Sequence, residues 1–215
     1  MGSAYDDDLW RLAPEDPGPP PAYLAAFVDG LGHAGAALDL GCGDGRLSAL
    51  LDAAELTLAD VSEVALGRAA RRLPTARTVA LEPDAPLPLP DNAFDLVLCA
   101  ETIEHVRDLQ LLLSEARRVL RPGGRLAVTT PVHSRLTGLD VLARGFECRF
   151  PPLSPHLRFL TRRSLRDLLG ELGFEPGAVR RSGGSLLVVA TRQLAASPRW
   201  RARMPRRRRR RGRGR

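Results

Sequence analysis

The chain has 215 residues, of which 44% are hydrophobic and 27% charged, which is typical of one soluble globular domain and too short for two. Its three cysteines, Cys42, Cys99 and Cys148, are far apart, which argues against a zinc site or a disulfide framework and favours a reducing cytoplasm. The net charge of +7 comes from residues 199–215, which hold 11 Arg and no acid; the remainder has 21 basic and 25 acidic residues, a net charge of −4.

The first residues give no sign of a targeting segment. MGSAYDDDLW is acidic and lacks the basic region and apolar run of a secretory signal, so we expect a cytoplasmic protein. The prolines between residues 17 and 21 form a stiff spacer. We therefore expect residues 1–21 to be irregular and to lie outside the main domain.

Strand and helix patterns then alternate along residues 22–192, which predicts one α/β domain with a parallel, doubly wound sheet. No apolar run approaches the roughly 20 residues of a membrane span. Residues 132–160 are expected to form a substrate-side connection, and residues 193–215 a disordered Arg-rich tail. The expected strands are Ala36–Leu40, Leu56–Asp60, Thr78–Glu82, Phe94–Ala100, Arg125–Thr130 and Ser185–Arg192. The expected helices are Ala22–Leu31, a short one from Arg46, one capped by Ser62 and running to Leu73, Leu109–Leu120 and Thr161–Leu172.

A glycine-rich loop follows the first strand, in the sequence ALDLGCGDG of residues 37–45. Glycines allow a sharp turn and let a ligand approach main-chain N–H groups closely. A tight turn without a ligand would also explain a bare glycine triplet. A dinucleotide site wants GxGxxG, and Arg46 stands where its last glycine belongs, which disfavours a nicotinamide or flavin enzyme.

Two acidic residues follow the next strands. Asp60 ends the second strand, 19 residues after Gly41, where a carboxylate can accept both ribose hydroxyls of a nucleoside. Asp84 follows the third strand and can take an adenine amino group, although an Asp between Pro83 and Pro86 also suits an ordinary turn.

Taken together, ALDLGCGDGRL, LADVSEVAL, LPLPDNAFDLVLCAETIEHV, EARRVLRPGGRLAVTTP and HLRFLTRRSLRDLLGELGFE resemble the class I S-adenosylmethionine (SAM)-dependent methyltransferases, in particular the ubiquinone and menaquinone methyltransferase branch. The resemblance implies a Rossmann-like seven-stranded sheet of order 3-2-1-4-5-7-6 with an antiparallel last strand. It implies SAM bound at the carboxyl ends of strands one, two and four. The residues it assigns to the cofactor are Asp39, Gly41, Cys42, Gly43, Gly45, Asp60, Val61, Asp84, Ala85, Ala100 and Glu101.

The acceptor side is less defined. His105, His156 and His133 are equal candidates for a general base, and each can instead be a capping or solvent-facing histidine. The segment from Glu101 to His105 reads ExxEH, and in some relatives a similar ExxEH binds a divalent ion with a later histidine. The resemblance therefore offers Glu101, Glu104, His105 and His156 as metal ligands, against a purely structural role.

The sequence thus predicts a SAM-dependent methyltransferase acting on a small molecule at oxygen or carbon. Two alternatives stay open: an enzyme acting on RNA, which the Arg-rich tail could bind, and a SAM- or S-adenosylhomocysteine (SAH)-binding protein without catalysis. The fold hosts many acceptors, so neither the acceptor nor the oligomeric state follows from these residues.

Overall fold

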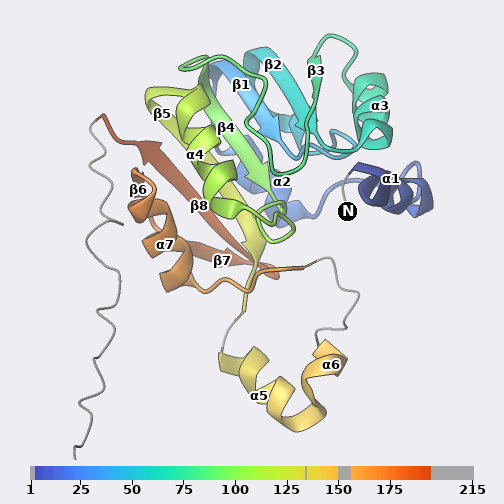
Figure 1. The fold of residues 1–215 in the computed structure, drawn as a ribbon, viewed down its shortest axis with the longest axis vertical. Coiled ribbons are helices and arrows are strands. Elements are labelled where there is room, and N and C mark those ends of the chain that lie inside the picture. Colours follow the sequence, from blue (N-terminus) through green and yellow to red (C-terminus); the bar gives the residue numbers. More distant parts are fainter. Residues whose placement is uncertain (1–2, 134, 150–155, 195–215) are drawn as a thin grey trace, which may run out of the picture.

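The computed structural model describes residues 3–133, 135–149 and 156–194 (Figure 1). Its helices are α1 (Ser3–Leu12), α2 (Ala22–Asp29), the 3-10 turn η1 (Ser48–Leu50), α3 (Glu63–Arg72), α4 (Leu109–Val119), α5 (Arg135–Arg144), α6 (Phe146–Arg149) and α7 (Arg162–Glu171). Its strands are β1 (Ala34–Leu40), β2 (Ala53–Asp60), β3 (Arg77–Ala80), β4 (Phe94–Ala100), β5 (Leu120–Pro131), β6 (Phe174–Pro176), β7 (Arg180–Ser182) and β8 (Ser185–Arg192).

The strands form one sheet in the order β3-β2-β1-β4-β5-β8-β6, with β7 paired to β8. The strands β1 to β5 are mutually parallel, whereas β8 runs antiparallel to β5. This order matches the predicted 3-2-1-4-5-7-6, because β8 takes the place of the predicted seventh strand and is antiparallel as expected. The short strand β7, which pairs with β8, was not predicted. The carboxyl ends of β1, β2, β4 and β5 therefore meet at one edge of the sheet.

Helices cover both faces of the sheet, as Figure 1 shows with α4 and α7 in front and α2 behind. On the first face, Leu113 of α4 and Leu165 of α7 are fully buried in one cluster with Leu38 and Val97. On the other face, Val28 of α2 packs in a second cluster with neighbouring strand residues. Burial on both faces explains why β1 and β4 read as almost continuously apolar runs.

The expectation that residues 1–21 are irregular is wrong for their first half, because residues 3–12 form α1. This helix packs against α3 rather than extending into solvent (Figure 1). Its apolar residues Tyr5, Leu9 and Leu12 follow a helical spacing of four and three, a signal that the acidic run partly hides.

Two other elements differ from expectation. The predicted helix from Arg46 is only the 3-10 turn Ser48–Leu50, after which Leu51 is already extended. Only two residues separate that turn from β2, so the chain has no room for a regular helix. The third strand is Arg77–Ala80, shifted toward the N-terminus from the predicted Thr78–Glu82.

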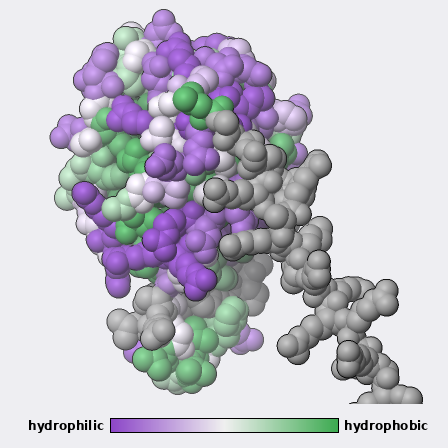
Figure 2. Space-filling view, turned by 90° about the vertical axis from the view of Figure 1, so that its left-hand side faces the viewer, coloured by the Kyte–Doolittle hydropathy of each residue, from purple (hydrophilic) through white to green (hydrophobic). Residues whose placement is uncertain are grey.

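The connection of residues 132–160 carries α5 and α6, which project away from the sheet (Figure 1). Leu139, Leu142 and Phe146 are 61%, 84% and 59% exposed on these helices. Figure 2 shows hydrophobic atoms gathered at this end of the molecule, below a mainly hydrophilic body. Among the described residues, no helix is long and apolar enough to cross a membrane. The predicted tail of residues 193–215 lies almost entirely outside the described residues.

Candidate functional site

The glycine loop turns back on β2 immediately after β1. The amides of Gly41 and Cys42 donate to the carbonyl of Ala59, at 2.8 and 3.1 Å, and so fix the loop to the end of the neighbouring strand. Gly41, Gly43 and Gly45 have φ angles of 81°, 55° and 78°, which L side chains rarely adopt. The loop is therefore a rigid turn whose shape requires glycine.

Asp60 joins the loop to the end of β2. Its Oδ2 accepts from the amide of Gly43 at 2.9 Å and its Oδ1 from the amide of Ser62 at 2.9 Å. The side chain is buried, and this burial raises its pKa, an effect that the two hydrogen bonds oppose and that the nearby carboxylate of Asp6 adds to. Val61 follows it, half-buried and packed against the core.

Asp39 lies in β1, two residues before Gly41, and its side chain is buried. Its Oδ2 accepts from the hydroxyl of Ser48 at 2.6 Å, while its Oδ1 has no hydrogen-bond partner among the described residues. Burial raises the pKa of Asp39 to about 7, against the lowering effect of the Ser48 hydroxyl. A buried acceptor without a donor is costly, so this oxygen fits a site that a polar or cationic ligand completes.

The end of β4 closes the other side of the loop. Glu101 has a φ of 51°, and its amide donates to the backbone and hydroxyl oxygens of Thr129. Its buried Oε1 has no hydrogen-bond partner among the described residues. Thr102 lies so close to the loop that a Cβ on Gly41 would come within 2.5 Å of its side chain. The structure thus brings the loop, the end of β2 and the end of β4 together.

Asp84 is placed differently from the other candidates. Its φ is 55°, it accepts from the amide of Asp108 at 3.3 Å, and it pairs with Arg107 at 2.7 Å. Both carboxylate oxygens thus already have partners at the start of α4. Ala85 follows it in the same loop, so their role toward adenine stays a prediction.

Glu104, His105 and His156 form a cluster whose potential ligand atoms all lie within 4.8 Å of one another. The segment that begins at His156 runs beside the residues that follow β4, because the amide of Leu157 donates to the carbonyl of Glu104 at 2.7 Å. The rings of His105 and His156 are 4.9 Å apart between centroids. Among the described residues Glu101 is not part of this cluster, unlike in the predicted ligand set.

Glu104 is the buried member of the cluster. Its Oε2 accepts from the hydroxyl of Thr130 at 3.0 Å, and its Oε1 lies 3.7 Å from Nε2 of His105. Burial raises the pKa of Glu104 to about 7, and burial together with His105 lowers the pKa of His156. The arrangement therefore holds a buried carboxyl group whose protonated form is favoured, beside an imidazole whose neutral form is favoured.

The third candidate base, His133, follows β5. Its amide donates to the carbonyl of Leu160 at 3.2 Å, and its ring packs edge-on against Phe159 with centroids 4.9 Å apart. His133 thus lies at the start of the connection that carries α5 and α6. Its ring contacts Phe159, whereas the rings of His105 and His156 contact each other.

Two residues of α1, Trp10 and Asp7, contact the site, and the sequence did not predict either contact. A Cβ on Gly43 would lie 2.7 Å from the indole of Trp10, so the ring lies directly against the glycine loop. The carboxylate of Asp7 accepts from the hydroxyl of Ser62 at 2.6 Å. Nothing in the sequence between residues 12 and 41 indicates this return of the chain onto the loop; only the helical spacing of α1 was available as a signal.

Comparisons with known proteins agree on one family. Residues 38–128 match the family model described as a methyltransferase domain. A probable S-adenosylmethionine-dependent methyltransferase of Mycolicibacterium smegmatis is 33% identical over 179 residues, 76% of this chain and 66% of the relative. A malonyl-[acyl-carrier protein] O-methyltransferase of Methylococcus capsulatus is 34% identical over 165 residues, 73% of this chain and 53% of the relative. These alignments cover just under two thirds and about half of the relatives' own lengths.

The fold also occurs in solved structures. The crystal structure of an S-adenosylmethionine-dependent methyltransferase from Mesorhizobium loti superposes with a TM-score of 0.59 at 22% identity, covering 79% of this chain and 96% of that one. Such a likeness concerns the fold alone. With the sheet order, the glycine loop and the matching sequence relatives, it leads to one conclusion: the chain belongs to the class I SAM-dependent methyltransferase family.

Proposed function

We propose that this chain transfers the methyl group of SAM to a small-molecule acceptor, at oxygen or carbon. The observation that carries the proposal is the buried Asp60 carboxylate bonded to the glycine loop at the switch point of the sheet. The proposed catalytic domain spans residues 22–192, and α1 accompanies it.

The residues at this edge fit SAM. Asp60 retains lone pairs for ribose hydroxyls, and the unpartnered oxygens of Asp39 and Glu101 fit the positive charge that SAM carries on its sulfonium and ammonium groups. The glycine loop supplies main-chain contacts at Gly41, Gly43 and Gly45. Cys42, Val61 and Ala100 would complete the walls, with Asp84 and Ala85 on the adenine side.

When bound, SAM supplies an electrophilic methyl group, so the protein contributes mainly orientation of the acceptor. A hydroxyl acceptor must also lose its proton to a base with a pKa near the working pH. His105 is the first candidate, because Oε1 of Glu104 lies 3.7 Å from its Nε2 and can help to orient the ring. His156 and His133 stand as alternatives on the same side.

Two facts favour a small acceptor over RNA. Outside residues 199–215 the chain has a net charge of −4, which does not attract a polyanion. A relative is named as an O-methyltransferase of a malonyl group on a carrier protein, which is a precedent for oxygen methylation of a carboxyl group.

The proposal is tested by incubating the protein with isotopically methyl-labelled SAM and either a metabolite extract or total RNA. A chain lacking residues 199–215 serves as the matched control. We expect label in the metabolites with both chains. Label in RNA that disappears with the tail would favour an RNA enzyme, and SAM binding with no labelled product would favour the non-catalytic alternative.

The cluster of Glu104, His105 and His156 supports a second proposal, a divalent metal ion that would orient and acidify a hydroxyl acceptor. Nitrogen and oxygen ligands of this kind suit Mn²⁺ or another transition ion. We expect Mn²⁺ to raise the melting temperature of the wild type but not of Glu104→Gln. Activity that survives EDTA, without any stabilisation by Mn²⁺, would contradict it.

A further inference from the structure

The N-terminal helix α1 lies against the glycine loop and the residues that follow β2, where the cofactor binds in the proposed function. Trp10 contacts the backbone of Gly43, and the carboxylate of Asp6 interacts electrostatically with both Asp60 and His105. Asp60 ends β2 and His105 follows β4, so α1 spans the two sides of the site. Asp60 is only 8% exposed beneath this cover.

Asp7 fastens α1 to the first turn of α3. Its Oδ1 accepts from the hydroxyl of Ser62 at 2.6 Å and from the amide of Val64 at 3.2 Å. These hydrogen bonds lower the pKa of Asp7, so the carboxylate stays charged across the physiological range. Ser62 also caps α3 and follows Asp60 by two residues, so the fastening lies directly beside the proposed ribose contact.

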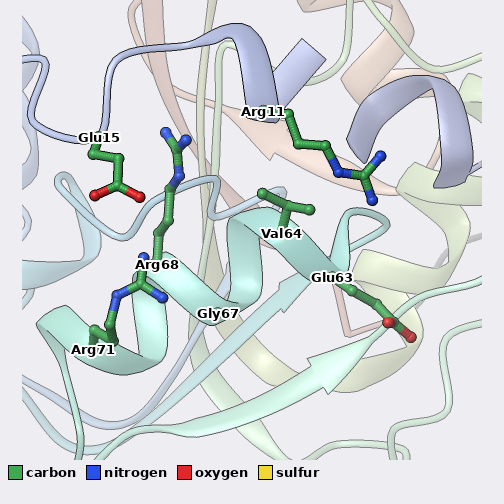
Figure 3. A pocket seen from close by; sticks show the side chains of 7 residues that line it. All are labelled: Arg11, Glu15, Glu63, Val64, Gly67, Arg68 and Arg71. Atoms are coloured by element: carbon green, nitrogen blue, oxygen red, sulfur yellow. The ribbon is translucent and has the colours of Figure 1, made fainter. Parts of the chain in front are cut away.

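Arg68 of α3 holds the far end of α1. Its guanidinium donates to the carbonyls of Ala13 and Pro14 at 3.1 and 2.9 Å, and lies 5.7 Å from the ring centroid of Trp10. Figure 3 shows Arg68 and Arg71 of α3 facing Arg11 and Glu15 across a pocket of about 340 Å³. The packing between the two helices is therefore incomplete, and discrete polar contacts carry the attachment.

The segment after α1 has the properties of a hinge. Prolines stiffen it at residues 14, 17 and 19–21, and Gly18, with a φ of 76°, is its one glycine. Arg46, beside the glycine loop, donates to the carbonyl of Gly18 at 3.2 Å. Rotation near Gly18 would lift α1 as a unit once the Asp7 and Arg68 contacts are broken.

We propose that α1 is a latched lid over the cofactor site, with Trp10 as its inner wall and Asp7 as the latch. The cofactor enters and leaves when the latch opens. This inference rests on the proposed function for the identity of the ligand, but the closed position of α1 is testable without any ligand.

The test compares Asp7→Ala with Asp8→Ala in a Trp200→Phe background, in which Trp10 is the sole tryptophan. Asp8 is the matched control, since its side chain is 70% exposed and pairs with Arg11 of the same helix, whereas that of Asp7 is 16% exposed. Without ligand, we expect acrylamide to quench Trp10 more strongly in Asp7→Ala, while Asp8→Ala matches the parent. Equal quenching in all three would overturn the latch.

Stopped-flow measurement of SAH binding then tests the gating. Losing the latch should speed both association and dissociation about tenfold and change the affinity less. Asp7→Asn keeps an oxygen acceptor and should restore most of the slow exchange, which a general loss of structure would not allow. Rates equal to those of Asp8→Ala would overturn the lid while leaving the proposed function intact. A parent protein that does not bind SAH would overturn both.

Discussion

At the scale of single residues, the site concentrates buried carboxyl groups at one edge of the sheet. Asp39, Asp60 and Glu104 are all buried, and burial raises the pKa of each. Two of them retain an oxygen without a hydrogen-bond partner among the described residues. Ionised carboxylates of this kind destabilise the folded protein. Binding of a cationic ligand to them would stabilise it and offset that cost.

This arrangement predicts a particular pH dependence. The pKa of Asp39 is raised from 3.8 to about 7 in the folded protein, so folding favours its protonated form. The stability it contributes is fully present below about pH 4 and is lost progressively as pH rises from 4 through 7, by roughly 4 kcal/mol in total. Asp39→Asn should remove that loss, so the variant gains on the wild type between pH 4.5 and 7.5.

Urea unfolding of both proteins across this range measures the difference. Asp29→Asn is the control, because Asp29 is exposed at the end of α2. A constant difference between Asp39→Asn and the wild type at every pH would contradict the assignment.

At the scale of elements, local signals predicted α3 and α7 well. Ser62 and Thr161 were the expected starts, and each side chain caps its helix. The glycine loop and the carboxylate of Asp60 were also predictable, because parallel strands end at a common edge. The position of α1 was not, since it depends on contacts of Asp7 and Trp10 with residues more than 30 positions away.

Arg118 of α4 organises the loop that leads into β4. Its guanidinium pairs with Glu115 at 2.7 Å and donates to the carbonyls of Leu87 and Leu89 at 2.9 and 2.8 Å. It also pairs with Asp91 at 2.5 Å. These contacts hold residues 87–91 against α4, where no regular secondary structure supplies backbone partners.

Removing the Arg118 guanidinium should lower the stability of the folded protein. Arg118→Met removes the guanidinium that donates to Glu115 and to the carbonyls of Leu87 and Leu89, and we expect a loss of about 2–4 kcal/mol in the free energy of unfolding. Its neighbour Arg117 makes only contacts of 3.4 Å, so Arg117→Met should cost less than about 1 kcal/mol. Chemical denaturation measures both, and similar losses in the two variants would count against a central role for Arg118.

At the scale of the whole molecule, one sheet carries the cofactor edge, a helical lid on one side of it and an apolar helical pair beyond β5. The lid comes from the N-terminus and the α5 and α6 pair from the connection after β5, and the two flank the proposed site (Figure 1). The net positive charge comes from residues 199–215, and the rest of the chain, which holds the site, has a net charge of −4. The proposed function therefore requires that SAM, a cationic ligand, binds at Asp60.

The most direct test is calorimetric titration of SAM and SAH into the wild type, Asp60→Ala and Asp29→Ala, whose thermal unfolding is checked first. Asp29 is exposed at the end of α2 and serves as the control. We predict that both ligands bind the wild type and Asp29→Ala equally, and bind Asp60→Ala at least about tenfold more weakly. Equal binding to a folded Asp60→Ala, or no binding to the wild type, would contradict the account.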